Sequence, residues 1–188
     1  MTAYAQAQPV RLLRCLLAAT LLAGALAPAA HAADRQVERG KYLVMLGSCN
    51  DCHTPGSLMG QSDIKRYLGG SDVGFAIPGM GVFVGPNLTP DKETGLGTWT
   101  RKQIVTAITT GKRPDGRVLA PIMPYEAFSH LTRADAFAIA AYLKSLKPVK
   151  HKVPGPFGPT EKATVFVMSV QPADVYNALP QPGGAPSK

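Results

Sequence analysis

Residues 49–53 contain two cysteines three positions apart and a histidine directly after the second, in the order C-N-D-C-H. This spacing is typical of the attachment of a c-type haem, because two thiols at this separation can add across the two vinyl groups of one porphyrin. The histidine that follows is held beneath the ring, where its imidazole can ligate iron. We therefore expect Cys49 and Cys52 to carry one covalent haem c and His53 to supply the first axial ligand.

The second axial ligand of the iron is predicted to be Met123. It lies between Pro121 and Pro124, where the backbone is extended and stiff, on a connection between two predicted helices. A thioether in this position raises the reduction potential and closes the iron to other ligands. Met80 is the second choice, because the glycines beside it allow the backbone to fold inward. The weaker candidates are Met45, Met59, Met168, His130 and His151.

The first 32 residues have the pattern of a secretory signal peptide. Arg11 and Arg14 precede an Ala/Leu-rich run over residues 15–27 that is too short to span a bilayer, and a small-x-small cleavage pattern ends at Ala32. We expect cleavage near Ala32 and a periplasmic mature protein. Cleavage would also remove Cys15, which leaves no cysteine for a disulfide, so the haem would have to stabilise the fold.

The mature chain is predicted to be basic. Of the 20 Lys and Arg residues two lie in the signal peptide, which leaves 18 against 12 Asp and Glu, a formal net charge of +6. This charge favours an acidic redox protein as a partner and leaves peripheral association with an anionic membrane open. Nucleic acid is not an expected partner, since the chain is exported and carries no nucleic-acid motif.

Three helices are predicted in the mature chain, over residues 35–48, 101–110 and 133–146. The first contains Gly40, which costs about 1 kcal/mol against alanine in a helix, and close approach of another helix would explain its presence. A T-x-x-Q capping box precedes the second helix. The third has apolar residues at i, i+3, i+4 and i+7 and ends before Pro148.

Long loops and a Pro-rich tail complete the predicted organisation. Residues 54–98 are rich in glycine and proline, and within them residues 81–85 are predicted to form a short strand. We divide the chain into a signal peptide (1–32), one haem domain (33–148) and an extension (149–188). In the extension, Val165, Phe166 and Met168 are expected to dock on the domain itself or on a partner.

Seven short runs stand out along the chain: G40-x-Y, C49-N-D-C-H, P86-N-L-T-P-D, G97-x-W, G111-K-R-P-D-G, M123-P-Y and A141-Y-L-K-S-L. Through these runs the chain resembles class I cytochrome c over residues 35–148. It is more closely similar to the single-haem domains in cytochrome subunits of bacterial membrane-associated dehydrogenase complexes. The resemblance implies an all-α fold of three main helices and long loops around one covalent haem. It also implies that the first and last helices cross at Gly40 and that Trp99 lies near the haem propionates.

The function expected from these features is one-electron transfer. With both axial positions of the iron closed, the protein would pass electrons between a dehydrogenase and a downstream cytochrome or terminal oxidase, as a free carrier or a bound subunit. It would not be an enzyme in its own right. The alternative is a haem enzyme or gas sensor with an open sixth position. A near-infrared thioether-to-iron band would distinguish the two.

Overall fold

The computed structural model of the chain describes residues 31–179. The predicted signal peptide, apart from residues 31 and 32, and the last part of the predicted extension lie outside the described residues. A helix over residues 31–46 comes first. It is followed by α2 (Cys49–His53), η1 (Ser57–Met59), η2 (Ile64–Arg66), β1 (Val73–Ile77), β2 (Gly81–Val84), α3 (Arg101–Thr110), α4 (Tyr125–Phe128), α5 (Arg133–Ser145), β3 (Phe166–Met168) and α6 (Ala173–Asn177).

The helix over residues 31–46 crosses α5 at a glycine. A Cβ on Gly40 would overlap the carbonyl oxygen of Ala138 and lie 2.8 Å from the Cβ of Tyr142. Only a residue without a side chain allows the two backbones to come this close. The expected crossing of the first and last helices at Gly40 is confirmed.

The first predicted helix ends two residues early, and the haem motif has a short helix of its own. Ser48 adopts a left-handed conformation with φ 50°, which interrupts the helical hydrogen bonding. The chain then turns into α2, which consists of the C-x-x-C-H residues alone. The motif is therefore held by a separate turn of helix rather than by the end of a long one.

The ends of α3 and α5 follow the predicted caps. The Thr100 side chain accepts a hydrogen bond from the Gln103 backbone N–H, and the Gln103 side chain accepts one from the Thr100 N–H, which makes the capping box. Gly111 closes α3 with φ 72°. At the start of α5, Thr132 accepts a hydrogen bond from the backbone N–H of Asp135. The bounds of α3 agree with the prediction and those of α5 differ by one residue.

A small sheet joins the middle of the chain to its end. β1 pairs antiparallel with β2 and parallel with β3, in the order β2-β1-β3. The sequence predicted only the strand found as β2, so the all-α description was incomplete. Gly74 within β1 weakens its strand pattern, and β3 pairs with it from far along the chain. The extension thus pairs with its own domain through the backbone of β3, one of the two outcomes left open, but of the side chains expected to dock, Phe166 and Met168 are 63% and 46% exposed.

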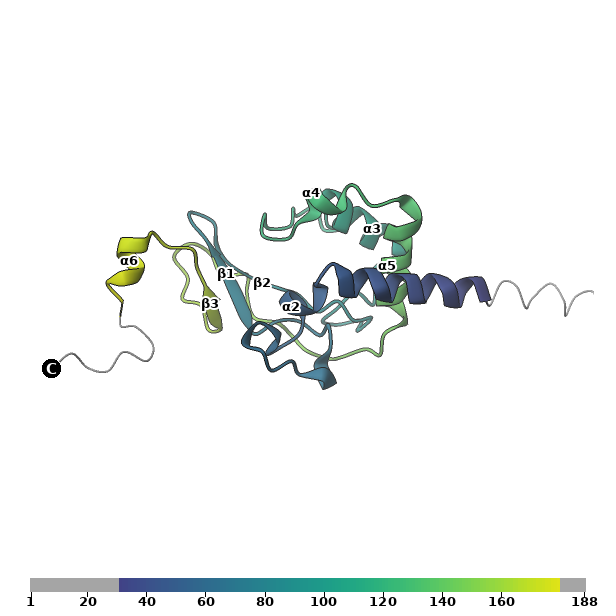
Figure 1. The fold of residues 1–188 in the computed structure, drawn as a ribbon, viewed down its shortest axis with the longest axis horizontal. Helices are drawn as coiled ribbons and strands as arrows, with labels where there is room; N and C mark the ends of the chain where they lie inside the picture. The colour runs from purple at the N-terminus through teal and green to yellow at the C-terminus, as the bar shows by residue number, and fades with distance from the viewer. Residues whose placement is uncertain (1–30, 180–188) are drawn as a thin grey trace, which may run out of the picture.

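The core lies where the helices meet. Figure 1 shows α3, α4 and α5 towards one end of the molecule and the sheet towards the other, with α2 between them. Within residues 31–179 no helix has the length and apolar character needed to cross a membrane. The buried cluster consists of Val44, Leu68, Leu96, Ile104, Ile139, Ala140, Tyr142 and Leu143.

Candidate haem site

The two cysteines of α2 are free thiols. Their spacing of three residues places both on one side of this short helix, and each is half-buried. Burial raises the pKa of the Cys49 thiol to about 11 and also raises the pKa of the Cys52 thiol. At neutral pH both side chains are therefore S–H groups. A thioether forms when such an S–H group adds across the double bond of a vinyl group.

His53 is buried and held by one hydrogen bond. Only 6% of the residue is exposed, and its Nδ1 lies 2.8 Å from the carbonyl oxygen of Pro86. Burial lowers the pKa of the imidazole, and the bond to Pro86 opposes this. Because a carbonyl can only accept, the neutral ring carries its proton on Nδ1. Nε2 then keeps its lone pair, and no donor in the described residues hydrogen-bonds to it.

Two loop segments pack directly against α2. The N–H of Gly70 donates to the carbonyl oxygen of His53 at 2.8 Å. On the other segment, a Cβ on Gly85 would overlap the carbonyl oxygen of Cys52 and lie 3.3 Å from His53 Nδ1. The backbone of Gly85 and Pro86 thus touches both the second cysteine and the histidine.

A buried polar pair fixes the segment that follows Pro86. Asn87 and Thr89 are each 1% exposed. Asn87 Oδ1 accepts hydrogen bonds from Thr89 N at 2.9 Å and from Thr89 Oγ1 at 2.7 Å. The polar groups of Asn87 and Thr89 thus bond to each other in a buried, low-dielectric environment, where a satisfied hydrogen-bond network is rigid. The Pro86 carbonyl is therefore preceded by a glycine in contact with α2 and followed by an anchored asparagine.

Sequence reasoning did not assign these supporting residues. Pro86, Asn87 and Thr89 lie in the P-N-L-T-P-D run that carried the family resemblance, so that run was the available signal, although it showed no role for them. Gly70 and Gly85 had no signal of their own in a glycine-rich segment. Their importance follows from how close two backbones come, which composition does not show.

Met123 lies on the connection between α3 and α4. Figure 1 shows α4 above α2 in this view. The backbone around Met123 is ordered by two turns: Met123 N–H donates to Ala120 O at 2.9 Å, and Tyr125 N–H donates to Met123 O at 2.8 Å. Phe128, at the end of α4, approaches the start of α2, since a Cβ on Gly47 would lie 3.7 Å from its ring and 3.7 Å from Cys49 Sγ.

The other candidate ligands differ from Met123 in exposure or in partners. Met123 is half-buried, whereas the remaining methionines of the described part, Met45, Met59, Met80 and Met168, are 46–63% exposed. His130 is exposed. His151 differs from His53 at Nε2: its Nδ1 donates to the carbonyl of Gly69 at 2.8 Å, and Arg66 Nη1 lies 3.5 Å from its Nε2.

Trp99, which the resemblance places near the haem propionates, lies beside one of the basic residues around it. The Arg113 guanidinium lies 5.3 Å from the centre of the half-buried Trp99 ring, a cation–π arrangement, and 3.3 Å from the Asp115 carboxylate. Lys112 and Arg101 are exposed. Arg113 is thus ordered next to Trp99, while the other two cations extend into solvent.

The donors around α2 suit a haem better than a bare metal ion. No group of three or more His, Cys, Asp or Glu residues in the described part is arranged to hold an ion. A porphyrin needs instead two neighbouring thiols and an imidazole with a free Nε2, and α2 supplies both. Asn50, between the cysteines, donates through Nδ2 to Ser57 Oγ at 3.0 Å, while its buried Oδ1 has no partner.

Comparison with known proteins identifies the family of the chain. The family model described as Cytochrome c matches residues 37–147. The chain is 40% identical over 132 residues to "Alcohol dehydrogenase (quinone), cytochrome c subunit" of Gluconacetobacter polyoxogenes, which covers 69% of this chain and 26% of that protein. It is 38% identical over 128 residues to "Fructose dehydrogenase cytochrome subunit" of Gluconobacter japonicus, with 64% and 24% covered.

A third relative, "Alcohol dehydrogenase (quinone), cytochrome c subunit" of Gluconobacter oxydans, is 37% identical over 125 residues, covering 64% of this chain and 24% of that protein. The chain thus spans about a quarter of the length of the curated relatives it matches. The resemblance to cytochrome subunits of bacterial dehydrogenase complexes is confirmed, and the chain belongs to the cytochrome c family.

Proposed function

We propose that this protein is a periplasmic one-electron carrier with one covalent haem c. Cys49 and Cys52 would form the two thioethers, and His53 and Met123 would be the axial ligands. Bound at α2, the haem supplies an iron that alternates between the ferric and ferrous states. The protein's part is to attach the group, to orient His53 and to exclude water.

The observation that carries this proposal is the state of His53. A histidine that ligates a metal through one ring nitrogen almost always donates from the other, which fixes its tautomer and orientation. The 2.8 Å bond from Nδ1 to Pro86 O has this role, and it leaves Nε2 as the ligating atom. The ring also follows directly after two free thiols on the same helix.

Met123 is proposed as the sixth ligand because of its exposure and its position. It is the one methionine within residues 31–179 that is not exposed, as expected for a thioether with an apolar setting. Its segment leads into α4, whose Phe128 approaches the start of α2.

The proposed partners are redox proteins. The relatives named above are cytochrome subunits of alcohol and fructose dehydrogenases, which supports electron exchange with a dehydrogenase. A downstream cytochrome or terminal oxidase is the proposed partner on the other side. The formal charge of +6 after removal of residues 1–32 favours acidic docking faces. The division into signal peptide (1–32), haem domain (33–148) and extension (149–188) belongs to the same proposal, as does peripheral membrane contact.

Covalent attachment is tested by acid–acetone extraction of the protein produced in a periplasm with haem-attachment machinery. We expect the haem to stay on the polypeptide, and a pyridine haemochrome spectrum to show two saturated vinyl groups. Cys49→Ala and Cys52→Ala should each leave one vinyl group unsaturated, whereas Ser57→Ala, a change beside α2 that spares both thiols, should not. Complete release of haem from the unaltered protein would refute the assignment.

Axial ligation is tested separately on the same material. A near-infrared thioether band in the oxidised protein, lost in Met123→Ala and kept in Met80→Ala, would support Met123 as the ligand. Fast carbon monoxide binding by the unaltered protein, with no such band, would favour instead a haem enzyme or gas sensor with an open sixth position.

A further inference from the structure

The chain does not leave the domain after α5 but turns back along the haem site. The match to the cytochrome c family ends at residue 147. The next residues, 149–153, which we call the strap, lie against two loop segments that both contact α2. The strap is half-buried at Val149, His151 and Val153 and exposed at Lys150 and Lys152. This alternation gives it an inner and an outer face.

At its beginning the strap binds the segment that carries the Pro86 carbonyl. Asn87 Nδ2 donates to Val149 O at 2.7 Å, and Val149 N–H donates to Thr89 Oγ1 at 3.0 Å. These bonds join the strap to the buried pair that follows Pro86. The Pro86 carbonyl in turn accepts the hydrogen bond of His53 Nδ1. Two residues, Asn87 and Pro86, therefore connect the strap to the ring of His53, the proposed iron ligand.

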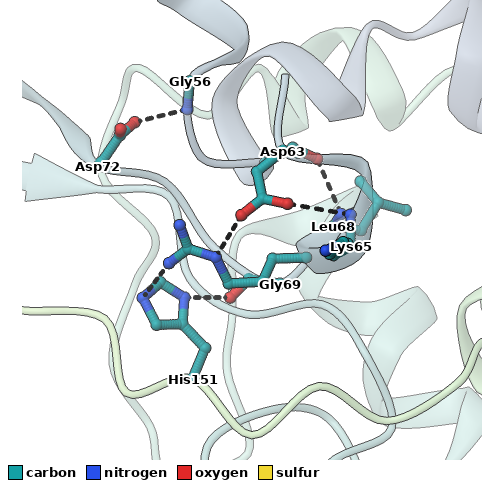
Figure 2. Close-up of polar contacts among 9 residues, drawn as sticks. Gly56, Asp63, Lys65, Leu68, Gly69, Asp72 and His151 are labelled. Atoms are coloured by element: carbon teal, nitrogen blue, oxygen red, sulfur yellow. Dashed lines mark hydrogen bonds and ion pairs between the residues drawn. The ribbon is translucent and has the colours of Figure 1, made fainter. Parts of the chain in front are cut away.

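At its centre the strap binds the segment that holds the backbone of His53. His151 Nδ1 donates to the carbonyl of Gly69 at 2.8 Å, and Arg66 Nη1 lies 3.5 Å from His151 Nε2, as Figure 2 shows for the labelled ring and carbonyl. Arg66 Nε in turn forms an ion pair with Asp63 Oδ2 at 2.8 Å. The residue after Gly69 is Gly70, whose N–H donates to His53 O.

Val153 completes the contact on this second segment. A Cβ on Gly70 would overlap Cγ2 of Val153, so the valine fills the space that this glycine leaves open. Gly70 has φ 105°, a conformation that strains any other residue. The strap thus reaches His53 by two routes, one through Pro86 to the ring and one through Gly70 to the backbone.

We propose that the strap is a positioning element for His53, acting through His151 and through the Asn87–Thr89 pair. This inference rests on the proposed function. By holding the Pro86 carbonyl against Nδ1, the strap keeps the imidazole strongly electron-donating, which favours the oxidised state of a bound iron. Loosening the strap should raise the reduction potential. The extension then influences the reduction potential of the haem domain and does not serve only to contact a partner.

Two variants loosen one route each in the full-length haem protein. His151→Ala removes the bond to Gly69, and the isosteric Thr89→Val removes the acceptor for Val149 N–H. His151→Asn is the rescue variant, because an asparagine amide nitrogen can stand near the position of Nδ1 and donate. Lys150→Ala is the matched control: this strap residue forms an exposed ion pair with Glu93, both side chains being 69% exposed, and such a pair adds little to stability.

The readouts are the reduction potential and hydrogen exchange followed by NMR in the reduced protein. His151→Ala should speed exchange of the Gly70 amide, and Thr89→Val that of the His53 Nδ1 proton, each by about fivefold to tenfold for one lost hydrogen bond. Both should raise the potential, while amides of α5 keep their rates. His151→Asn should restore the Gly70 rate and the potential. Lys150→Ala should change neither.

Two results would overturn the proposal. In the first, His151→Ala and Thr89→Val have the same reduction potential and the same local exchange rates as Lys150→Ala. The other is a uniform acceleration that includes α5, which would make the strap a general stabiliser. If the unaltered protein carried no covalent haem, the proposed function would fail, yet the exchange rates of Gly70 and His53 would still decide whether the strap holds this histidine.

Discussion

Replacing Gly85 with alanine tests whether the loop backbone must lie directly on α2. A Cβ there would overlap the Cys52 carbonyl oxygen and lie 2.8 Å from its carbonyl carbon. Carbon atoms pack best at about 3.5–4.0 Å, so the loop and α2 would have to separate by about 1 Å. A shift of this size takes the bond from His53 to Pro86, now 2.8 Å, beyond ordinary hydrogen-bonding distance.

The expected cost combines two effects. Overpacking between backbones costs about 1–3 kcal/mol. A buried Nδ1–H left without its acceptor costs about 1–3 kcal/mol more. We therefore expect Gly85→Ala to lower the free energy of unfolding by about 2–6 kcal/mol. We also expect it to raise the reduction potential, because a ring that no longer donates to Pro86 is a weaker electron donor to iron.

Guanidinium denaturation of the haem-loaded protein measures the first effect, and redox titration measures the second. Gly158→Ala is the matched control: it is the same substitution, its nearest neighbour would be Glu161 at 3.6 Å, an ordinary contact, and its backbone is not in the left-handed region. The control should stay within about 0.5 kcal/mol of the unaltered protein. A Gly85→Ala protein with unchanged stability and potential would refute the close contact between this loop and α2.

Three further outcomes are expected. Met123→Ala should lower the reduction potential and allow imidazole to bind, as followed by redox titration and absorbance, because loss of a thioether removes preferential stabilisation of ferrous iron; an unchanged potential would assign the ligand elsewhere. Gly40→Ala should destabilise the protein by about 1–3 kcal/mol in denaturation, since overpacking against Ala138 outweighs the gain in helix propensity, and a stabilised variant would contradict the crossing. Electron transfer to an acidic partner should slow as the salt concentration rises, as measured by the second-order rate constant against ionic strength. This dependence should be weaker after Lys112→Gln and Arg117→Gln, because both side chains are exposed. A rate constant of the unaltered protein that does not change with salt would exclude electrostatic steering.

Local patterns predicted the helices well because their determinants are local. The capping box at Thr100 and Gln103 and the apolar spacing of residues 133–146 act within a few residues, and α3 and α5 follow them. The sheet was largely missed for the opposite reason. Its third strand pairs Phe166 with Val73, and no short-range pattern records a partner so far away.

The sequence by itself was enough to predict the chemistry of this protein. Two thiols and an imidazole at the C-x-x-C-H spacing are typical of haem attachment, and this pattern can be read from the sequence because the reacting atoms come from one short segment. Only the tertiary structure decided what holds His53. Its acceptor lies 33 residues away at Pro86, and the strap reaches Thr89 and Gly69 across 60 and 82 residues. Such contacts depend on how loops close around the core, and that is a property of the whole chain rather than of any one motif.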